Sequence, residues 1–301
     1  MEQVLPIQRF PKLALLLLGA LLGYAVAASA LWAYQAHQIF ESDRSLHANP
    51  SDFPYPVIDV AVPVSSRGHA PETLRGWWIP AAKPGAKAVL YLHGNDGNMS
   101  TSIGEVGPLR ELGYSVFLID YRGFGASEGA FPSEASVYED AEAAWRHLTG
   151  TVRVKPSDLF IYGHSLGGAV AIELARRHPE AAGLVVESGF TSIYEMAMLD
   201  RRYSVFPLGL FLNQRFESIG KVAELALPVL YIHGTADEVV PHDMGLRLFL
   251  ASGGAKRFIS IEGGRHDNNS FVGGAAFRAA IGAFVGDTAG LQSLALRRAA
   301  P

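Results

Sequence analysis

Residues 159–177 of the chain read LFIYGHSLGGAVAIELARR, and this stretch decides the fold. Its first four residues, Leu159–Tyr162, form a dense apolar run that predicts a strand buried on both faces. A helical pattern begins near Leu166, so only three residues separate the strand from the helix. Glycines on both sides of Ser165 allow the strand and helix to pack closely. The stretch therefore predicts a nucleophile elbow with the Ser165 hydroxyl pointing out of a sheet.

The same alternation of apolar runs and helical patterns extends over most of the chain. The other runs with strand character are Val57–Val62, Leu74–Ile79, Ala88–His93, Tyr114–Ile119, Leu184–Glu187, Val229–His233 and Phe258–Ile261. The other helical patterns are Ile103–Leu112, Ser133–Leu148, His242–Ala251 and Phe271–Val285. This rhythm predicts an α/β fold, with a mostly parallel eight-stranded sheet and helices on both faces. In such sheets, active sites lie at the carboxyl ends of the strands.

The N-terminal part of the chain contains an uncharged apolar segment, Leu13–Ala36. A helix of this length rises by about 30 Å or more, which is enough to cross a bilayer core. Arg9 and Lys12 precede the segment, so the positive-inside bias places the following domain on the non-cytoplasmic side of the membrane. A cleaved signal peptide, with a site at residues 28–30, is the main alternative, and a buried helix of a soluble protein is another.

We divide the chain into an anchor, a linker, a domain and a tail. The bounds are 1–36 for the anchor, 37–54 for the polar linker, 55–285 for the domain and 286–301 for the C-terminal tail. Residues 191–227 are too many for an ordinary connection and are rich in Met, Phe and Leu, which predicts a helical cap. With a linker in between, removal of residues 1–36 is expected to leave an intact domain.

Composition excludes several classes of function. The net charge is −4 and no run of Lys or Arg occurs, so we expect no nucleic-acid surface. The absence of cysteine excludes disulfides, thiolate metal sites and a cysteine nucleophile. The chain also has no His-Glu-x-x-His pair for zinc, and the loop from Gly94 to Gly97 lacks the Lys-Ser/Thr pair of a phosphate loop. We therefore expect neither a metal nor a cofactor.

A serine nucleophile needs a histidine base, and the base needs an acid that orients it. The motif HGTAD follows the strand Val229–His233 and ends at Asp237, while GGRH follows the last strand and ends at His266. Both motifs lie at carboxyl ends of strands, in the chain order serine, acid, histidine. Glu187, at the end of the preceding strand, is the alternative acid.

An oxyanion formed at Ser165 needs two N–H donors. The first expected donor is Leu166, directly after the nucleophile, and the second is Asn95, in the loop HGNDGN after the third strand. Asp96 stands next to the second donor. The glycine-rich loop from Asp120 to Gly129 is interpreted as a packed structural loop.

Together these motifs resemble those of the α/β-hydrolase superfamily, and within it the membrane-anchored abhydrolases close to serine aminopeptidase-like and lysophospholipase-like members. The shared motifs are LHGN (92–95), DYRG (120–123), GHSLG (163–167), ESGF (187–190), HGTAD (233–237) and GGRH (263–266). The resemblance implies the α/β-hydrolase fold and hydrolysis of carboxylic esters or thioesters by a Ser165–Asp237–His266 triad without a cofactor. Similar loops more often carry a small residue at the position of Asp96. An acid beside the oxyanion donor would disfavour anionic acyl groups, so this difference affects the choice of substrate and not the mechanism.

Three functions remain open after these observations. The first is a hydrolase for small-molecule or lipid-like acyl substrates, because apolar cap residues suit alkyl groups. The second is a peptidase, in which Glu195, Asp200 or Glu217 of the cap would bind the amino terminus of the substrate. The third is a non-catalytic, membrane-tethered binding protein, which would be expected to lack a member of the triad.

Overall fold

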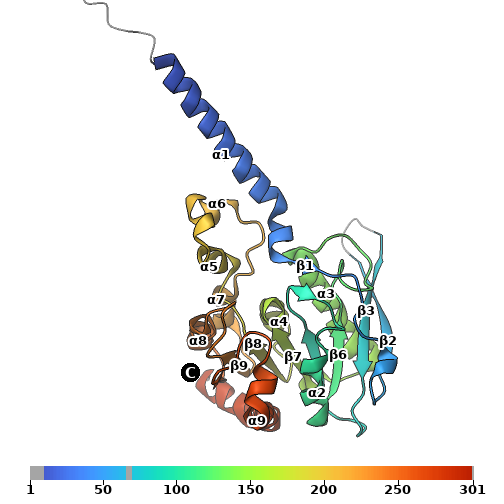
Figure 1. Ribbon diagram of the computed structural model, residues 1–301. Coiled ribbons are helices and arrows are strands. Elements are labelled where there is room, and N and C mark those ends of the chain that lie inside the picture. The colour runs from blue at the N-terminus through green and yellow to red at the C-terminus, as the bar shows by residue number, and fades with distance from the viewer. Residues whose placement is uncertain (1–9, 66–69, 300–301) are drawn as a thin grey trace, which may run out of the picture.

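The computed structural model describes residues 10–65 and 70–299, and its central sheet carries helices on both faces (Figure 1). The main sheet has the strand order β10-β9-β8-β7-β4-β6-β3-β2. Its strands are β2 (Ile58–Val64), β3 (Glu72–Ile79), β4 (Ala88–Leu92), β6 (Ser115–Ile119), β7 (Leu159–His164), β8 (Gly183–Glu187), β9 (Val229–Gly234) and β10 (Lys256–Ile261). The predicted α/β fold with an eight-stranded sheet is confirmed.

The sheet is mostly parallel, as the sequence predicts. Strands β4, β6, β7, β8, β9 and β10 run in one direction, and β3 is antiparallel to both β6 and β2. Consequently the loops after the parallel strands meet at one edge of the sheet. A second, two-stranded sheet pairs β1 (Glu41–Ser42) in parallel with β5 (Asp96–Gly97), which the sequence did not indicate.

Helices cover both faces of the main sheet, and this explains the dense apolar runs of its strands. The larger helices are α2 (Ile103–Glu111), α3 (Glu134–Arg146), α4 (Leu166–Arg177), α8 (His242–Ala251) and α9 (Asn269–Ala299). Neighbouring residues of β7 point to opposite faces: Phe160 packs against Phe284 of α9, whereas Ile161 lies in the core formed with α3 and α4. Helix α9 continues beyond residue 285, where we expected the tail to begin.

The predicted cap, residues 191–227, is helical but belongs to the core in its second half. The outer elements are α5 (Ile193–Met198), η4 (Arg201–Val205) and α6 (Leu208–Phe211), and the inner ones are α7 (Ser218–Lys221) and η5 (Val222–Glu224). Phe216, Val222 and Leu227 are buried in the same core cluster as α4. The cap that stands above the sheet is therefore shorter than the sequence suggests.

Helix α1 (Phe10–Ile39) projects from the domain beyond the cap (Figure 1). It is long and apolar enough to cross a membrane, a criterion that a signal sequence also meets. Only 6% of its most apolar stretch is buried, unlike a core helix of a soluble protein. Arg9, which contributes to the predicted orientation, and the last two residues of the predicted tail lie outside the described residues.

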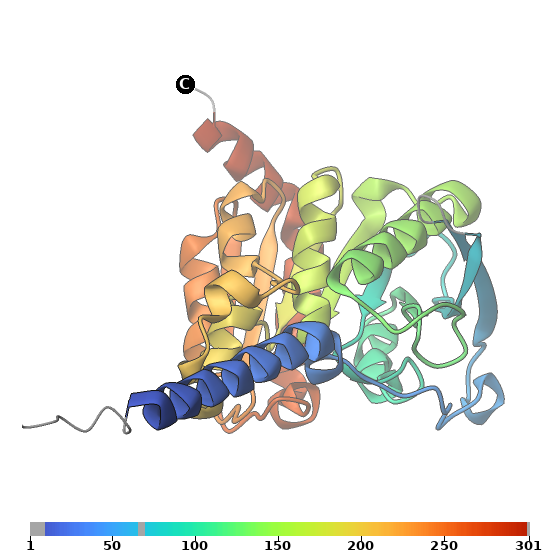
Figure 2. The same ribbon diagram turned by 90° about the horizontal axis from the view of Figure 1, so that it is seen from above.

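The C-terminal half of α1 lies along the cap, as the view from above shows (Figure 2). The Tyr24 ring stacks on Phe206, with ring centroids 5.5 Å apart. The buried side chain of Gln35 donates to the carbonyl oxygen of Phe211 at 2.8 Å and accepts from the amide of Asn213 at 2.9 Å. The helix is therefore docked on the cap, through a stacked pair of rings and hydrogen bonds to the cap backbone.

The segment after α1 is attached to the domain, although we expected residues 37–54 to form a polar linker. Phe40 is buried and packs edge-to-face against Phe124 and Phe216. The next two residues form β1 against β5. The polar composition of the segment concealed this attachment, because a few scattered aromatic residues, such as Phe40 and Phe53, and backbone pairing provide it.

We predict that deleting residues 1–36 destabilises the domain, contrary to the expectation from the sequence alone. The two hydrogen bonds of Gln35 contribute about 2 kcal/mol, and their loss should lower the melting temperature by about 4–8 °C. Thermal unfolding and limited proteolysis of the cap would measure the effect. Deletion of residues 1–20 is the matched control, since it keeps Tyr24 and Gln35. Equal stability of the two truncated proteins would contradict the prediction.

Candidate active site

The turn between β7 and α4 has the geometry of a nucleophile elbow. Ser165 adopts φ 52° and ψ −120°, a conformation that costs about 1–3 kcal/mol and persists only where the surroundings enforce it. A Cβ atom on Gly163 would lie 2.1 Å from the carbonyl oxygen of Gly167. A Cβ atom on Gly167 would lie 2.0 Å from the carbonyl oxygen of Leu92. Both glycines are therefore required for the close packing of strand and helix.

The structure brings the side chains of Ser165, His266 and Asp237 into one hydrogen-bonded row. His266 Nε2 lies 2.9 Å from Ser165 Oγ, and His266 Nδ1 lies 2.9 Å from Asp237 Oδ2. The three residues follow β7, β10 and β9, so they meet at the carboxyl edge of the sheet. In this arrangement the imidazole can accept the serine proton while the carboxylate orients the ring.

Asp237 is held in place by the backbone and by a second histidine. Its Oδ1 accepts from the amides of Val239 and Val240 at 2.9 and 2.8 Å. His233 Nε2 lies 3.2 Å from its Oδ2. Burial raises the pKa of Asp237, but hydrogen bonds from His233 and His266 outweigh this effect and keep the pKa well below its usual value. The carboxylate is therefore ionised at neutral pH.

The role of His233 as a partner of Asp237 was missed, because we assigned no function to this residue from the sequence. The available signal was its position four residues before the acid, in the motif HGTAD. His233 is buried, and its Nε2 also lies 3.0 Å from the carbonyl oxygen of Val240. The ring thus connects the strand end to the loop that carries the acid.

Glu187, the alternative acid, does not contact the His266 ring. Its buried carboxylate accepts a hydrogen bond from the hydroxyl of Tyr162. It lies instead in a buried group of charges beneath the elbow, together with Glu105 of α2 and His164. Burial lowers the pKa of His164, but the negative charges of Glu105 and Glu187 outweigh burial and raise it to about 9. Burial raises the pKa of Glu105 to about 7.

The buried charges support the loop that carries the base. The ring Nε2 of His164 donates to the carbonyl oxygen of His266 at 3.0 Å, and Ser188 Oγ donates to the same oxygen at 3.0 Å. Ligand atoms of His164, His266 and Asp267 lie within 4.8 Å of one another, close enough for a metal ion. Such an ion would compete with the contacts that the ring nitrogens of both histidines already make.

The two expected oxyanion donors, Leu166 and Asn95, line the same cavity beside Ser165. Leu166 is the first residue of α4, and N–H groups of a first helical turn have no acceptor within the helix. The second donor is fixed by the end of α1: Asn95 Nδ2 donates to the carbonyl oxygen of Ile39 at 3.0 Å, and the Asn95 carbonyl accepts from the amide of Glu41 at 2.8 Å.

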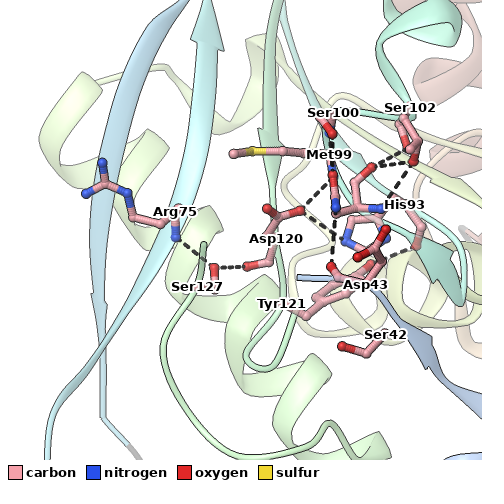
Figure 3. A network of polar contacts seen from close by, with 12 residues as sticks. Ser42, Asp43, Arg75, His93, Met99, Ser100, Ser102, Asp120, Tyr121 and Ser127 are labelled. Carbon is pink, nitrogen blue, oxygen red and sulfur yellow. Dashed lines mark hydrogen bonds and ion pairs between the residues drawn. The ribbon is translucent and has the colours of Figure 1, made fainter. Parts of the chain in front are cut away.

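A buried polar network supports the oxyanion loop from below (Figure 3). The amide of Met99 donates to Asp120 Oδ1 at 2.6 Å, and Ser127 Oγ donates to the Asp120 carbonyl at 2.7 Å. The Tyr121 hydroxyl donates to the carbonyl oxygen of His93 at 3.2 Å. Burial raises the pKa of Asp120 to about 7 and lowers the pKa of His93 to about 4. The loop that begins at Asp120 therefore has the structural role interpreted from its sequence.

Above Ser165 lies a mostly apolar cavity of about 260 Å³. The elements that line it are the end of α1, the oxyanion loop, the elbow, the outer cap and the loop after Asp237. The lining residues are Leu31, Gln35, Gln38, Ile39, Asn95, Ser165, Leu166, Phe190, Ile193, Met196, Ala197, Asp200, Tyr203, Leu208, Phe211, Leu212, Val239 and Val240. The contribution of α1 was missed, because an apolar helix carries no signal for the surface on which it packs.

Known proteins are similar to this chain in sequence and in fold. The model of a family described as serine aminopeptidase, S33, matches residues 83–213. An uncharacterized protein of Mycobacterium tuberculosis (strain H37Rv) is 36% identical over 257 residues, covering 83% of this chain and 90% of the relative. The alpha/beta hydrolase domain-containing protein WAV2 of Arabidopsis thaliana is 31% identical over 224 residues, covering 68% of this chain and 71% of the relative.

Among solved structures, an esterase of Pyrococcus furiosus superposes with a TM-score of 0.66 at 19% identity, covering 83% of this chain and 98% of that one. At this identity the similarity concerns the fold alone. The sequence relatives, in contrast, are similar enough and cover enough of the chain to show its family. With the nucleophile elbow, the strand order and these relatives, the chain belongs to the α/β-hydrolase family.

Proposed function

We propose that the protein is a serine hydrolase that cleaves carboxylic esters or thioesters with apolar acyl groups. The observation that carries this proposal is the hydrogen-bonded row Ser165–His266–Asp237, which opens into a largely apolar cavity. Membership in a hydrolase family supports the same conclusion.

The reaction would proceed by double displacement. Ser165 Oγ attacks the carbonyl carbon while His266 Nε2 takes the hydroxyl proton, and the ionised Asp237 stabilises the resulting imidazolium. The backbone N–H groups of Leu166 and Asn95 bind the oxyanion of the tetrahedral intermediate. The imidazolium returns its proton to the leaving alcohol or thiol, which leaves an acyl-enzyme. Water then attacks the acyl group with His266 as base, and Ser165 regains its proton.

The cavity supports apolar acyl groups as substrates. Its walls are formed mainly by Leu, Ile, Met, Phe and Val side chains from α1, the cap and the loop after Asp237. Its volume lies just below the roughly 300–1,000 Å³ usual for ligand pockets, which suits a medium acyl chain better than a bulky polar group.

A peptidase is the second candidate, supported by the match to a family described as serine aminopeptidase. It would need a free acid for the substrate's amino group. Asp200 is the one acid among the described lining residues, and it is paired with Arg202. Glu195 of the cap is paired with Arg247. Glu217, the third candidate acid, does not line this cavity. These observations favour the esterase. A non-catalytic binding protein is disfavoured because the chain keeps all three triad residues.

Ser165→Ala should abolish ester hydrolysis and labelling by a fluorophosphonate probe, because it removes the attacking oxygen without crowding the elbow. Loss of a triad member leaves less than about a thousandth of the activity. Hydrolysis of p-nitrophenyl butyrate and gel-based labelling would measure both effects. Ser204→Ala, on the exposed surface of the cap, should retain labelling. Substantial activity in Ser165→Ala would require another nucleophile.

Asp237→Asn should reduce kcat by about 10⁴-fold, since the amide neither selects the required tautomer nor stabilises the imidazolium. Glu187→Gln is the matched comparison. Its amide oxygen can still accept from Tyr162, so its effect should be much smaller. Steady-state kinetics of both variants on one ester decides between the two acids. A greater loss in Glu187→Gln would reverse the assignment.

Values of kcat/KM for p-nitrophenyl esters from acetate to palmitate should increase with chain length until the cavity is filled. Each buried methylene contributes about 0.8 kcal/mol, so the increase should be steep over the first few carbons. Aminoacyl amides tested beside the esters should be poorer substrates. A maximum at acetate, or faster cleavage of the amides, would favour the peptidase.

A further inference from the structure

The outer cap ends in an apolar segment that the proposed reaction does not require. Residues 203–212 read YSVFPLGLFL and contain no charge, and we call them the cap tip. Val205 and Leu210 are 66% and 86% exposed, although other residues of the same segment line the cavity. The segment thus combines exposed apolar side chains with an uncharged sequence, which is typical of an interaction surface.

The cap tip lies against the middle of the apolar segment of α1. The Tyr24 hydroxyl donates to the carbonyl oxygen of Val205 at 3.1 Å, and the Tyr24 ring stacks on Phe206. The apolar segment runs from Leu13 to Ala36, and a hydrocarbon core of about 30 Å takes about 20 helical residues. Whichever 20 residues span the core, Tyr24 lies at least about 10 Å from either surface. Its partners in the cap tip must then lie below the membrane surface.

We propose that the cap tip inserts into the bilayer that α1 crosses, and that the cavity receives acyl chains from that bilayer. The entry of acyl chains rests on the proposed function, whereas the membrane contact does not. The occupant of this surface is the hydrocarbon of the bilayer, since the tip is uncharged and continuous with the exposed apolar side chains of α1.

The proposal requires the cap tip to contact both the cavity and the bilayer, and different residues of the tip are available for each. Leu208, Phe211 and Leu212 line the cavity, while Val205 and Leu210 do not line it and are exposed. The tip and α1 thus form a thin wall between the cavity and the surroundings, with Leu31 as a lining residue on the helix side.

Charged residues occur only on the flanks of the cap tip. In the sequence, Asp200, Arg201 and Arg202 precede it and Arg215 follows it, and all three arginines are exposed. Arg202 is paired with Asp200, and the Arg215 guanidinium donates to the carbonyl oxygen of Gly209 in the tip at 2.8 Å. Arginine side chains near a membrane surface extend toward the headgroups while their stems stay in apolar surroundings. The tyrosine hydroxyl at the contact with α1 has a hydrogen-bond acceptor, as a polar group in hydrocarbon needs.

The absence of cysteine from the chain permits a direct test of the membrane contact. In the full chain carrying Ser165→Ala, Leu210→Cys would be labelled with an NBD fluorophore and reconstituted into phosphatidylcholine–phosphatidylglycerol vesicles. The label should show blue-shifted emission and quenching by nitroxide groups on lipid acyl chains. Leu250→Cys on α8, which is 65% exposed, is the matched control and should remain water-like. Leu17→Cys on α1 should be quenched.

An unquenched label at residue 210 with a quenched label at residue 17 would overturn insertion of the tip. An unquenched label at residue 17 would overturn it as well, because α1 would not cross the bilayer. Neither measurement depends on hydrolysis, so the membrane contact can fail without contradicting the proposed function.

The entry of acyl chains is tested with Leu210→Glu, which changes an exposed residue that does not line the cavity. A charge on a lipid-facing surface should reduce hydrolysis of a fluorogenic palmitoyl ester carried in vesicles by about tenfold. Hydrolysis of p-nitrophenyl butyrate in solution should be unchanged, and Leu250→Glu should change neither rate. Equal losses on both esters, or no loss on either, would overturn entry from the bilayer. A wild-type protein that hydrolyses neither ester would instead contradict the proposed function.

Discussion

The close packing of β7 against α4 is the constraint on which the site depends. Side chains cannot be accommodated at Gly163 and Gly167, where the backbone of the elbow meets that of its neighbours. This contact forces Ser165 into its left-handed conformation and directs the hydroxyl away from the sheet. The same contact places the N-terminus of α4 beside the hydroxyl, so one turn would supply both the nucleophile and an oxyanion donor of the proposed reaction.

Electrostatic support for the site comes from residues that do not themselves react. His233 and two backbone amides keep Asp237 ionised and correctly oriented. On the other side of the elbow, His164 balances the buried carboxyl groups of Glu105 and Glu187 and holds the backbone of the base loop. The separation of the two acids follows from this arrangement, because Asp237 faces the base whereas Glu187 belongs to the buried group of charges.

Helix α1 connects the N-terminal apolar segment to the active-site region through contacts near its C-terminal end. Gln35 binds the backbone of the cap, and the end of the helix binds Asn95 in the oxyanion loop. Phe40 then anchors the following segment in the core. A displacement of this helix would therefore move a wall of the cavity and the proposed oxyanion donor Asn95 together, so we expect α1 to behave as part of the domain rather than as a separable tether.

The sequence by itself determined the eight strands, the elbow at Ser165 and the order of the acid and base, because each depends on a local pattern: a buried apolar run, a glycine-flanked turn, or a polar residue just after a strand. It left Asp237 and Glu187 as alternatives, since both end strands, and only the folded sheet decided which one faces His266. The docking of α1, the attachment of residues 37–54 and the roles of Gln35 and His233 likewise depended on tertiary structure. The partners of α1 and of residues 37–54 are distant in the chain or are backbone atoms, and neither kind of contact leaves a periodic pattern in the sequence. His233 precedes Asp237 by only four residues, but the fold of the loop between them is what brings the ring to the carboxylate.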